Sequence, residues 1–136
     1  MSREEQLRLV EGLHAPESGL LERTSLFDLL APEVEWLVAG SPEVLPWAGV
    51  FRGPDGVTQW MQTLDEHLEY DRFEAVEFFA DGDTVIEIVL AGGRAHATGS
   101  AFESEVVRIW TFRGNEAIRV RSFYDTGAYE RAVLGS

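Results

Sequence analysis

The sequence predicts an α+β domain in which a mostly antiparallel sheet packs against helices that come early in the chain. Apolar residues recur three to four positions apart in the first part of the chain, whereas from Phe73 onward the period becomes two. Short glycine turns, Asp81-Gly82-Asp83 and Gly114-Asn115, separate the later segments, and strands joined by such turns pair antiparallel. Because 136 residues suit one hydrophobic core, we expect a single domain over residues 1–136.

Helical periodicity or helix-start signals mark four segments. They are residues 3–13, 20–30, 57–68 and 125–134. Pro16 and Pro32 oppose continuation of the first two helices, because proline lacks an N–H and restricts the residue before it. Pro54-Asp55-Gly56 provides a start signal for the third helix. Asp125 can accept hydrogen bonds from the free amides of the last helix, so we expect it to act as the N-cap.

Segments rich in β-branched and aromatic residues mark five strands. They are residues 34–38, 73–79, 84–91, 102–112 and 118–124. Gly40-Ser41-Pro42 and Gly92-Gly93 predict the ends of the first and third of these strands. The segment that leads from Ser41 to Phe51 is expected to form a loop that carries Trp47.

Composition excludes several classes of function. The chain has 24 acidic against 11 basic residues, a formal charge of −13, and such a surface repels nucleic acid and anionic lipid. It has no cysteine, which excludes disulfides, thiolate nucleophiles and cysteine metal sites. The first residues are charged and lead into no apolar run of signal-peptide or membrane-span length. We therefore expect no nucleic acid or membrane partner and a cytoplasmic location.

Four motifs occur in a characteristic order along the chain. They are Leu30-Ala31-Pro32-Glu33-Val34-Glu35-Trp36, Pro46-Trp47-Ala48-Gly49-Val50-Phe51-Arg52-Gly53-Pro54-Asp55-Gly56-Val57, Asp81-Gly82-Asp83-Thr84-Val85 and Phe123-Tyr124-Asp125-Thr126. Together they resemble the SnoaL-like branch of the nuclear transport factor two superfamily, over about residues 20–134. The resemblance implies a cone-shaped fold whose bent sheet and helices enclose a pocket open at one end.

The resemblance also implies the kind of partner. Members of the superfamily include polyketide cyclases, ketosteroid isomerases, limonene-type epoxide hydrolases and binding domains without catalysis, so the fold alone does not decide the function. It implies a small hydrophobic molecule in the pocket and no cofactor. Relatives often pair through the outer face of the sheet, so a homodimer is expected, with the region from Arg108 to Arg121 offering polar contacts.

Two positions lack the acids that catalytic relatives carry. Ketosteroid isomerases place a carboxylate base on the first strand, and aligning Gly40 with the glycine after that strand puts Leu37 at this position. Limonene-type epoxide hydrolases and SnoaL-type cyclases use an aspartate late in the last strand, where this chain has Ser122. Because leucine cannot accept a proton, the resemblance leaves the usual proton-transfer residues incomplete unless others substitute for them.

Glu87, His67 and Tyr124 are the candidate catalytic residues. Glu87 interrupts an apolar strand, where burial raises the pKa of an unpaired carboxyl and suits a general acid or base. An ion pair with Arg108 or a partly exposed outer position is the alternative. Histidine shuttles protons near neutral pH, so His67 or His96 could act as the base. Tyr124 or Arg108 would then polarise a substrate oxygen.

A larger set of aromatic and polar residues is expected to line the pocket. Alternation puts Arg108 on the same face as Trp110, and Ser122 on the same face as Tyr124. Trp47 lies in a loop near the expected mouth, where it could cover a flat ligand or belong to the core. The predicted ligand-binding residues are Trp36, Leu37, Trp47, Phe51, Trp60, Arg108, Trp110 and Ser122.

Two hypotheses for the function remain open. The first is binding of a small, largely apolar, carbonyl-bearing molecule, with cofactor-free isomerisation, cyclisation or hydration by proton transfer. The second is a non-catalytic binding or dimerisation module, which Leu37 and Ser122 favour. His14, His67 and His96 show no metal-ligand spacing, so no metal site is predicted.

Overall fold

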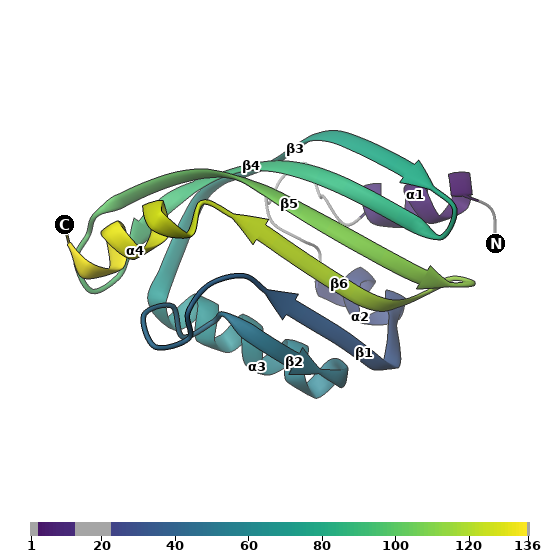
Figure 1. The fold of residues 1–136 in the computed structure, drawn as a ribbon, viewed down its shortest axis with the longest axis horizontal. Coiled ribbons are helices and arrows are strands. Elements are labelled where there is room, and N and C mark those ends of the chain that lie inside the picture. Colours follow the sequence, from purple (N-terminus) through teal and green to yellow (C-terminus); the bar gives the residue numbers. More distant parts are fainter. Residues whose placement is uncertain (1–2, 13–22, 136) are drawn as a thin grey trace.

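The computed structural model describes residues 3–12 and 23–135, in which six strands form one sheet and four segments form helices (Figure 1). The elements in chain order are α1 (Arg3–Glu11), α2 (Arg23–Leu29), β1 (Leu30–Val38), β2 (Gly49–Arg52), α3 (Gly53–His67), β3 (Leu68–Asp81), β4 (Thr84–Ala95), β5 (Ala101–Arg113), β6 (Glu116–Tyr124) and α4 (Thr126–Leu134). The predicted α+β class is confirmed. His14, Pro16 and the predicted start of the second helix near Leu20 lie outside the described residues.

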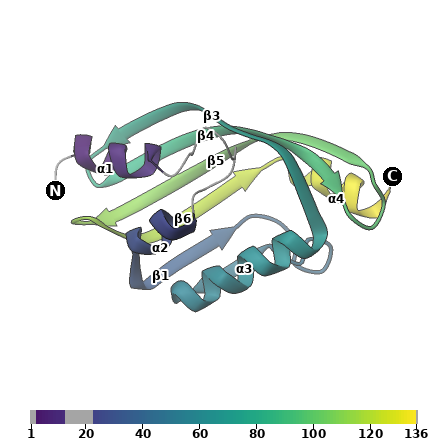
Figure 2. The same ribbon diagram turned by 180° about the vertical axis from the view of Figure 1, so that it is seen from behind.

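The sheet is curved, and three helices lie on one of its faces. The strand order is β2-β1-β6-β5-β4-β3, with β1 and β6 parallel and all other neighbours antiparallel. Figures 1 and 2 show α1, α2 and α3 on the same side, which we call the inner face, and α4 at the end of the molecule opposite α1. None of the helices within the described residues is long and apolar enough to cross a membrane.

Helix α3 forms one wall of the inner space, and its sequence explains both of its ends. Gly53 adopts a positive φ of 69° and Pro54 occupies the first turn, where a missing N–H costs no hydrogen bond. Val57 and Trp60 turn toward the sheet and are buried. At Leu68 the backbone becomes extended, with φ −130° and ψ 146°, so α3 passes directly into β3. The helix is thereby fixed at both ends to strands of the same sheet.

Strand β4 continues beyond Gly92-Gly93, where the sequence predicts its end. Gly93 pairs with Tyr70 of β3, and the register of this strand pair shifts between Tyr70 and Arg72. A Cβ atom at Gly93 would lie 1.9 Å from the backbone oxygen of Glu69, so only glycine permits this approach. Gly93 therefore marks a close approach of β3 to β4 rather than a strand end.

The first two strands also differ from the prediction. Strand β1 begins at Leu30 rather than Val34, and its pairing with β6 is irregular between Leu30 and Glu35. Pro32, which cannot donate to a ladder, falls within that irregular stretch. Residues 49–52, predicted as the end of a loop, form the short edge strand β2 beside β1. The other three predicted strands lie within β3, β5 and β6. β5 and β6 are slightly longer than expected, whereas β3 begins at Leu68 rather than Phe73 and ends at Asp81.

The carboxyl-terminal helix confirms its predicted cap. Asp125 precedes α4, and its carboxylate oxygen accepts a hydrogen bond of 3.0 Å from the backbone N–H of Ala128. The helix ends at Gly135, whose φ of 76° is left-handed and whose N–H donates to the carbonyl of Arg131. Both ends of α4 are therefore satisfied locally.

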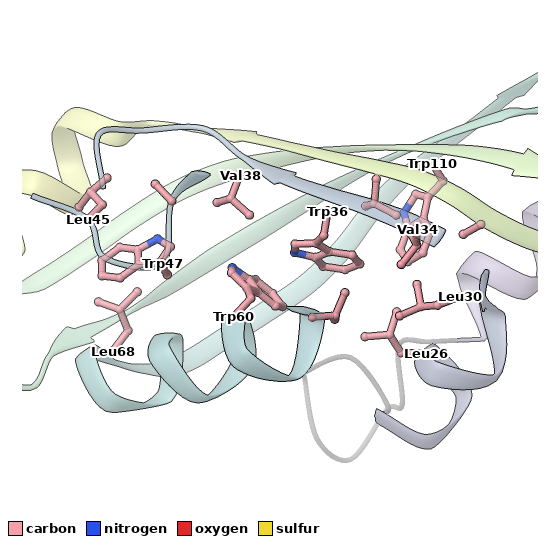
Figure 3. Close-up of a cluster of buried hydrophobic side chains, with 14 of the residues drawn as sticks. Leu26, Leu30, Val34, Trp36, Val38, Leu45, Trp47, Trp60, Leu68 and Trp110 are labelled. Carbon is pink, nitrogen blue, oxygen red and sulfur yellow. The ribbon is translucent and has the colours of Figure 1, made fainter. Parts of the chain in front are cut away.

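A cluster of indole rings fills the inner space at the end near α2 (Figure 3). The rings of Trp36 and Trp60 lie 4.9 Å apart, and Trp36 meets Trp110 edge to face at 6.0 Å. Trp36 and Trp110 are fully buried. Large rings dominate burial in small cores. The interior is therefore packed at this end, and any hollow has to lie toward α4.

Candidate functional site

A cavity of about 560 Å³ lies between the inner face of the sheet, the carboxyl-terminal half of α3 and α4. This volume falls within the range of roughly 300–1,000 Å³ that small-molecule pockets occupy. Its wall is mainly apolar and is formed by Val38, Trp47, Trp60, Met61, Leu64, Asp65, Leu68, Glu69, Tyr70, Phe73, His96, Val106, Arg108, Ser122, Tyr124 and Tyr129. A few polar groups thus interrupt a mainly apolar wall.

Arg108 provides the buried cation on the inner face. Strand pairing places it directly opposite Glu87 on β4 and Ser122 on β6, so the three side chains form one row across the sheet. Its Nη1 donates to Glu87 Oε1 at 3.2 Å, and its Nε donates to Ser122 Oγ at 3.4 Å. The guanidinium carbon also lies 5.8 Å from the ring of Trp36 and 5.5 Å from that of Phe73. These contacts hold the guanidinium at the floor of the cavity.

Glu87 lies behind Arg108 rather than on the cavity wall. Its side chain is 0% exposed, and its Oε1 accepts hydrogen bonds from Arg108 Nη1 and from Trp110 Nε1 at 2.9 Å. Of the alternatives that the sequence leaves open, the ion pair with Arg108 is the one present. A carboxylate engaged in this way holds its partners in place and is not poised to take a proton from a ligand.

Three tyrosines gather at the side of the cavity nearest α4. The hydroxyls of Tyr70 and Tyr129 lie 3.0 Å apart, while the Tyr124 hydroxyl donates to the Ala39 carbonyl at 2.5 Å and accepts from Trp47 Nε1 at 3.1 Å. Burial raises the pKa of all three phenols, and it raises that of Tyr70 to about 12 although its hydrogen bond to Tyr129 opposes the shift. These hydroxyls are therefore neutral donors at physiological pH.

Asp65, Glu69 and His96 form the exposed part of the wall, which we call the cavity mouth. His96 Nε2 lies 3.1 Å from the backbone oxygen of Asp65. Since a carbonyl only accepts, Nε2 carries the proton and Nδ1 of the neutral ring keeps a lone pair. In residues 3–12 and 23–135, no three or more His, Asp or Glu side chains come together as a metal-binding group.

Six of the residues predicted from the sequence lie on the cavity wall. They are Trp47, Trp60, His96, Arg108, Ser122 and Tyr124. Trp47 was expected either to line the pocket or to belong to the core. It does both, because its side chain is buried and also forms part of the wall. Figure 3 shows Trp47 and Trp60 at the end of the aromatic cluster, next to Val38. Among these residues Arg108 contacts Ser122 and Tyr124 contacts Trp47, so the wall carries two separate hydrogen-bonded pairs.

The remaining predicted residues lie off the wall, for identifiable reasons. Alternation along β1 turns Leu37 to the outer face and gives the wall position to Val38. Trp36 and Trp110 are buried in the core, and Phe51 packs against that core from the edge strand β2. His67 lies at the end of α3 with its Nδ1 2.8 Å from the Thr63 carbonyl.

Several wall residues were not predicted from the sequence. Met61, Leu64 and Leu68 recur at the helical period of three to four. This period indicates that they face the interior, but not whether they pack against other side chains or line a cavity. Tyr70 falls before the predicted start of its strand, and Tyr129 is placed by the packing of α4. The other unpredicted wall residues are Val38, Asp65, Glu69, Phe73 and Val106.

Comparisons with known proteins agree with this fold. Residues 21–120 match the family model of the SnoaL-like domain. An NTF2-like protein from Burkholderia xenovorans LB400 is 29% identical, with 98% of each chain covered and a TM-score of 0.81. An NTF2-like protein from Burkholderia thailandensis E264 is 23% identical, with 97% of this chain and 98% of the other covered and a TM-score of 0.82. TerC, co-crystallised with polyporic acid, is 20% identical with a TM-score of 0.80, covering 95% of this chain and 98% of its own. Among curated proteins, none matches this chain.

Proposed function

The chain belongs to the SnoaL-like domain family, and from that membership we propose that it binds a small, largely apolar, carbonyl-bearing molecule in the cavity. The observation that carries the proposal is the guanidinium of Arg108 at the floor of a mainly apolar cavity. A buried donor that already has its protein contacts can orient one acceptor oxygen of a ligand. The rest of the ligand would then lie against the rings and the α3 side chains.

The shape of the wall supports a flat or polycyclic ligand. Trp47, Trp60, Tyr70, Phe73 and Tyr129 place aromatic surface around the cavity. Aromatic rings bury a large area at little cost in side-chain entropy, and they favour stacked or edge-on contacts with other rings. A fused aromatic ketone therefore combines the two features that the cavity offers, an apolar surface and one hydrogen-bond donor group.

Calorimetric titration with methyl naphthyl ketone tests the binding function. Met61 lines the cavity from α3, whereas its neighbour Gln62 is exposed and off the wall. Replacement Met61→Trp fills part of the cavity, and we expect it to weaken ketone binding by about tenfold or more, equivalent to about 1.4 kcal/mol. The matched variant Gln62→Trp should bind as the original protein does. Equal affinity of the two variants would contradict binding in this cavity.

Proton transfer on the bound ketone is the second candidate function. It is favoured by the presence of His96 and the Tyr70–Tyr129 hydroxyl pair on the same wall as Arg108. In this reaction His96 Nδ1 would take a proton from the carbon next to the carbonyl, and Arg108 would stabilise the enolate oxygen. The same proton, or one from solvent, would return to that carbon or to a conjugated one, so no cofactor is needed.

Hydrogen–deuterium exchange distinguishes binding from proton transfer. In deuterium oxide, a catalytic protein should accelerate exchange of the methyl protons of methyl naphthyl ketone, followed by proton NMR. Replacement His96→Ala should abolish the acceleration, whereas His67→Ala should retain it because His67 is off the wall. If the protein binds the ketone without accelerating exchange, the function is binding alone.

A further inference from the structure

We propose that Glu87 sets the charge selectivity of the cavity, so that it accepts an uncharged carbonyl compound and discriminates against the corresponding carboxylate. The inference rests on the proposed binding function and adds the class of ligand that the site prefers. An arginine at the floor of a pocket usually indicates a carboxylate or phosphate ligand. Here the surroundings of Arg108 point to the opposite preference.

The charge of Arg108 is already compensated within the protein. Arg108 Nη1 and Glu87 Oε1 lie 3.2 Å apart, with the two side chains 4% and 0% exposed. The pair is neutral as a unit. A ligand carboxylate at the guanidinium would give the group a net charge of −1 in a poorly solvated interior, and an uncompensated buried charge is strongly unfavourable.

A neutral carbonyl oxygen avoids this cost and still finds a donor. Arginine has five N–H groups, and the contacts of Arg108 with Glu87 and Ser122 engage its Nη1 and Nε. No hydrogen bond within the described residues uses Nη2. The guanidinium therefore retains donor capacity for one acceptor oxygen without needing a second negative charge.

A second unused donor lies close to the same space. The indole Nε1 of Trp60 is buried and has no hydrogen-bond partner among the described residues, although Trp60 lines the cavity. Figure 3 shows this nitrogen on the side of the ring nearer to Trp47 and Val38, two other wall residues. A buried donor without a partner is costly, so an acceptor on the ligand would relieve it. The cavity thus offers a ligand two kinds of donor, the uncharged indole N–H of Trp60 and the guanidinium of Arg108, whose charge Glu87 compensates.

The charge of the cavity mouth also disfavours anionic ligands. Asp65 and Glu69 are exposed on the wall there, and the whole chain has a formal charge of −13. A negative potential at an entrance lowers the local concentration of anions and slows their association. An anionic ligand is therefore disfavoured both on its way in and at its binding position.

The test compares two ligands that differ only in the polar group. Calorimetric titration of the protein with methyl naphthyl ketone and with naphthoate, at a pH near neutral, gives the two Kd values. We expect the ketone to bind at least about tenfold more tightly than naphthoate. Ethylnaphthalene, which has the ring but no acceptor oxygen, should bind more weakly than the ketone.

Replacement Glu87→Gln then isolates the role of the charge. Glutamine keeps the shape and one acceptor oxygen for Trp110 but leaves Arg108 as an uncompensated cation, so naphthoate should gain about tenfold or more relative to the ketone. Replacement Glu105→Gln is the control, because Glu105 is exposed on β5 and its loss changes the net charge equally. It should leave the ratio of the two Kd values unchanged.

The outcomes separate this inference from the proposed function. If naphthoate binds the original protein as tightly as the ketone, or if Glu87→Gln leaves the ratio unchanged, the charge selectivity is refuted while binding in the cavity stands. If the ketone, naphthoate and ethylnaphthalene all fail to bind the original protein, the proposed function fails as well. The comparison in the original protein needs no variant, so it holds even if Glu87→Gln does not fold.

Discussion

At the scale of single residues, Arg108 and Glu87 depend on each other for their place in the interior. Both side chains are almost completely buried, and the hydrogen bond of Trp110 to Glu87 adds a third partner. A buried ion pair contributes little beyond an apolar pair of similar volume, but removing one member leaves a buried charge without its partner. The pair therefore fixes geometry more than it adds stability.

Single and double replacements should reveal this dependence. Arg108→Met should lower the free energy of unfolding by about 3–5 kcal/mol, because Glu87 is left buried and uncompensated. The double variant Glu87→Leu/Arg108→Met should lose clearly less than Arg108→Met alone. Urea denaturation followed by tryptophan fluorescence measures both values.

Arg119→Met provides the control for these variants. Arg119 is exposed on β6, so its loss should change the free energy of unfolding by no more than about 0.5 kcal/mol. If the double variant is as unstable as Arg108→Met, the pair is not coupled in the way its contacts indicate.

The three tyrosines predict how stability depends on alkaline pH. They are all the tyrosines of the chain, and burial raises the pKa of each above the ordinary value of 10.0. The folded protein therefore keeps phenolic protons that the unfolded chain loses, so their contribution is complete below pH 10 and declines as pH rises toward about 12, the pKa of Tyr70. Near-ultraviolet titration should show no tyrosinate in the folded protein near pH 10. Tyrosinate absorbance that appears at the ordinary pKa without unfolding would contradict this burial.

Alternation along the late strands predicted correctly which of their residues share a face. Arg108 and Ser122 share the inner face with Trp110 and Tyr124, as period two requires. Leu37 was assigned to the pocket by alignment with relatives, and its own strand's alternation gives that place to Val38. The depth of each residue could not be predicted, because it depends on which side chains of other elements fill the space.

At the scale of elements, α4 contributes Tyr129 to the cavity wall and depends on its cap. Tyr129 of α4 contributes to the wall and reaches Tyr70 through its hydroxyl. The amino terminus of this nine-residue helix is held by Asp125. Short helices are marginal without such contacts, so the cap helps to hold Tyr129 in position.

Replacement Asp125→Ala should lower the free energy of unfolding by about 1 kcal/mol, the usual cost of losing an N-cap. Asp125→Asn should retain most of the stability, because the amide oxygen can accept the same hydrogen bond from Ala128. Thermal unfolding of the three proteins, followed by circular dichroism, measures the difference. An alanine variant as stable as the asparagine variant would show that the cap contributes nothing.

Helices and strands were predicted where a local sequence pattern specifies them and missed where a tertiary contact does. The β3–β4 and β5–β6 connections were predicted because Gly82 and Gly114 adopt positive φ values in tight turns. Strand β2 was missed, since four residues flanked by glycine are typical of a loop and pair only because β1 offers an edge. The continuation of β4 was missed because Gly93 is required by the approach of β3, a tertiary contact that no local pattern reports.

At the scale of the whole molecule, the sheet face opposite the cavity exposes several large apolar side chains and carries no helix among the described residues. Val50, Phe79 and Phe123 are 53%, 51% and 46% exposed, and alternation puts Phe123 beside Val107 and Ile109 on this outer face. Arg121, on the same strand, has a buried Nε without a partner within the described residues. Arg108 lies on the inner face instead, so it cannot contribute to contacts here.

We propose that two copies of the chain pair through this outer face. Apolar patches of this kind on soluble domains commonly mark interfaces. Light scattering coupled to gel filtration should give the mass of a dimer at micromolar concentration, and Ile109→Glu should give that of a monomer, because it places a charge at the centre of the face. The variant Glu103→Gln, at an exposed position of the same strand, should remain dimeric. A monomer mass for the unaltered protein would refute the pairing.

The hollow between the curved sheet, α3 and α4 is the feature on which the binding function depends. It is most directly tested by a crystal structure of the protein soaked with methyl naphthyl ketone. We expect the naphthyl rings between Trp60 and Tyr129, with the carbonyl oxygen at a hydrogen-bond distance of roughly 2.7–3.2 Å from a guanidinium nitrogen of Arg108. A cavity filled only by water, or a ketone bound on the outer face of the sheet, would contradict this account.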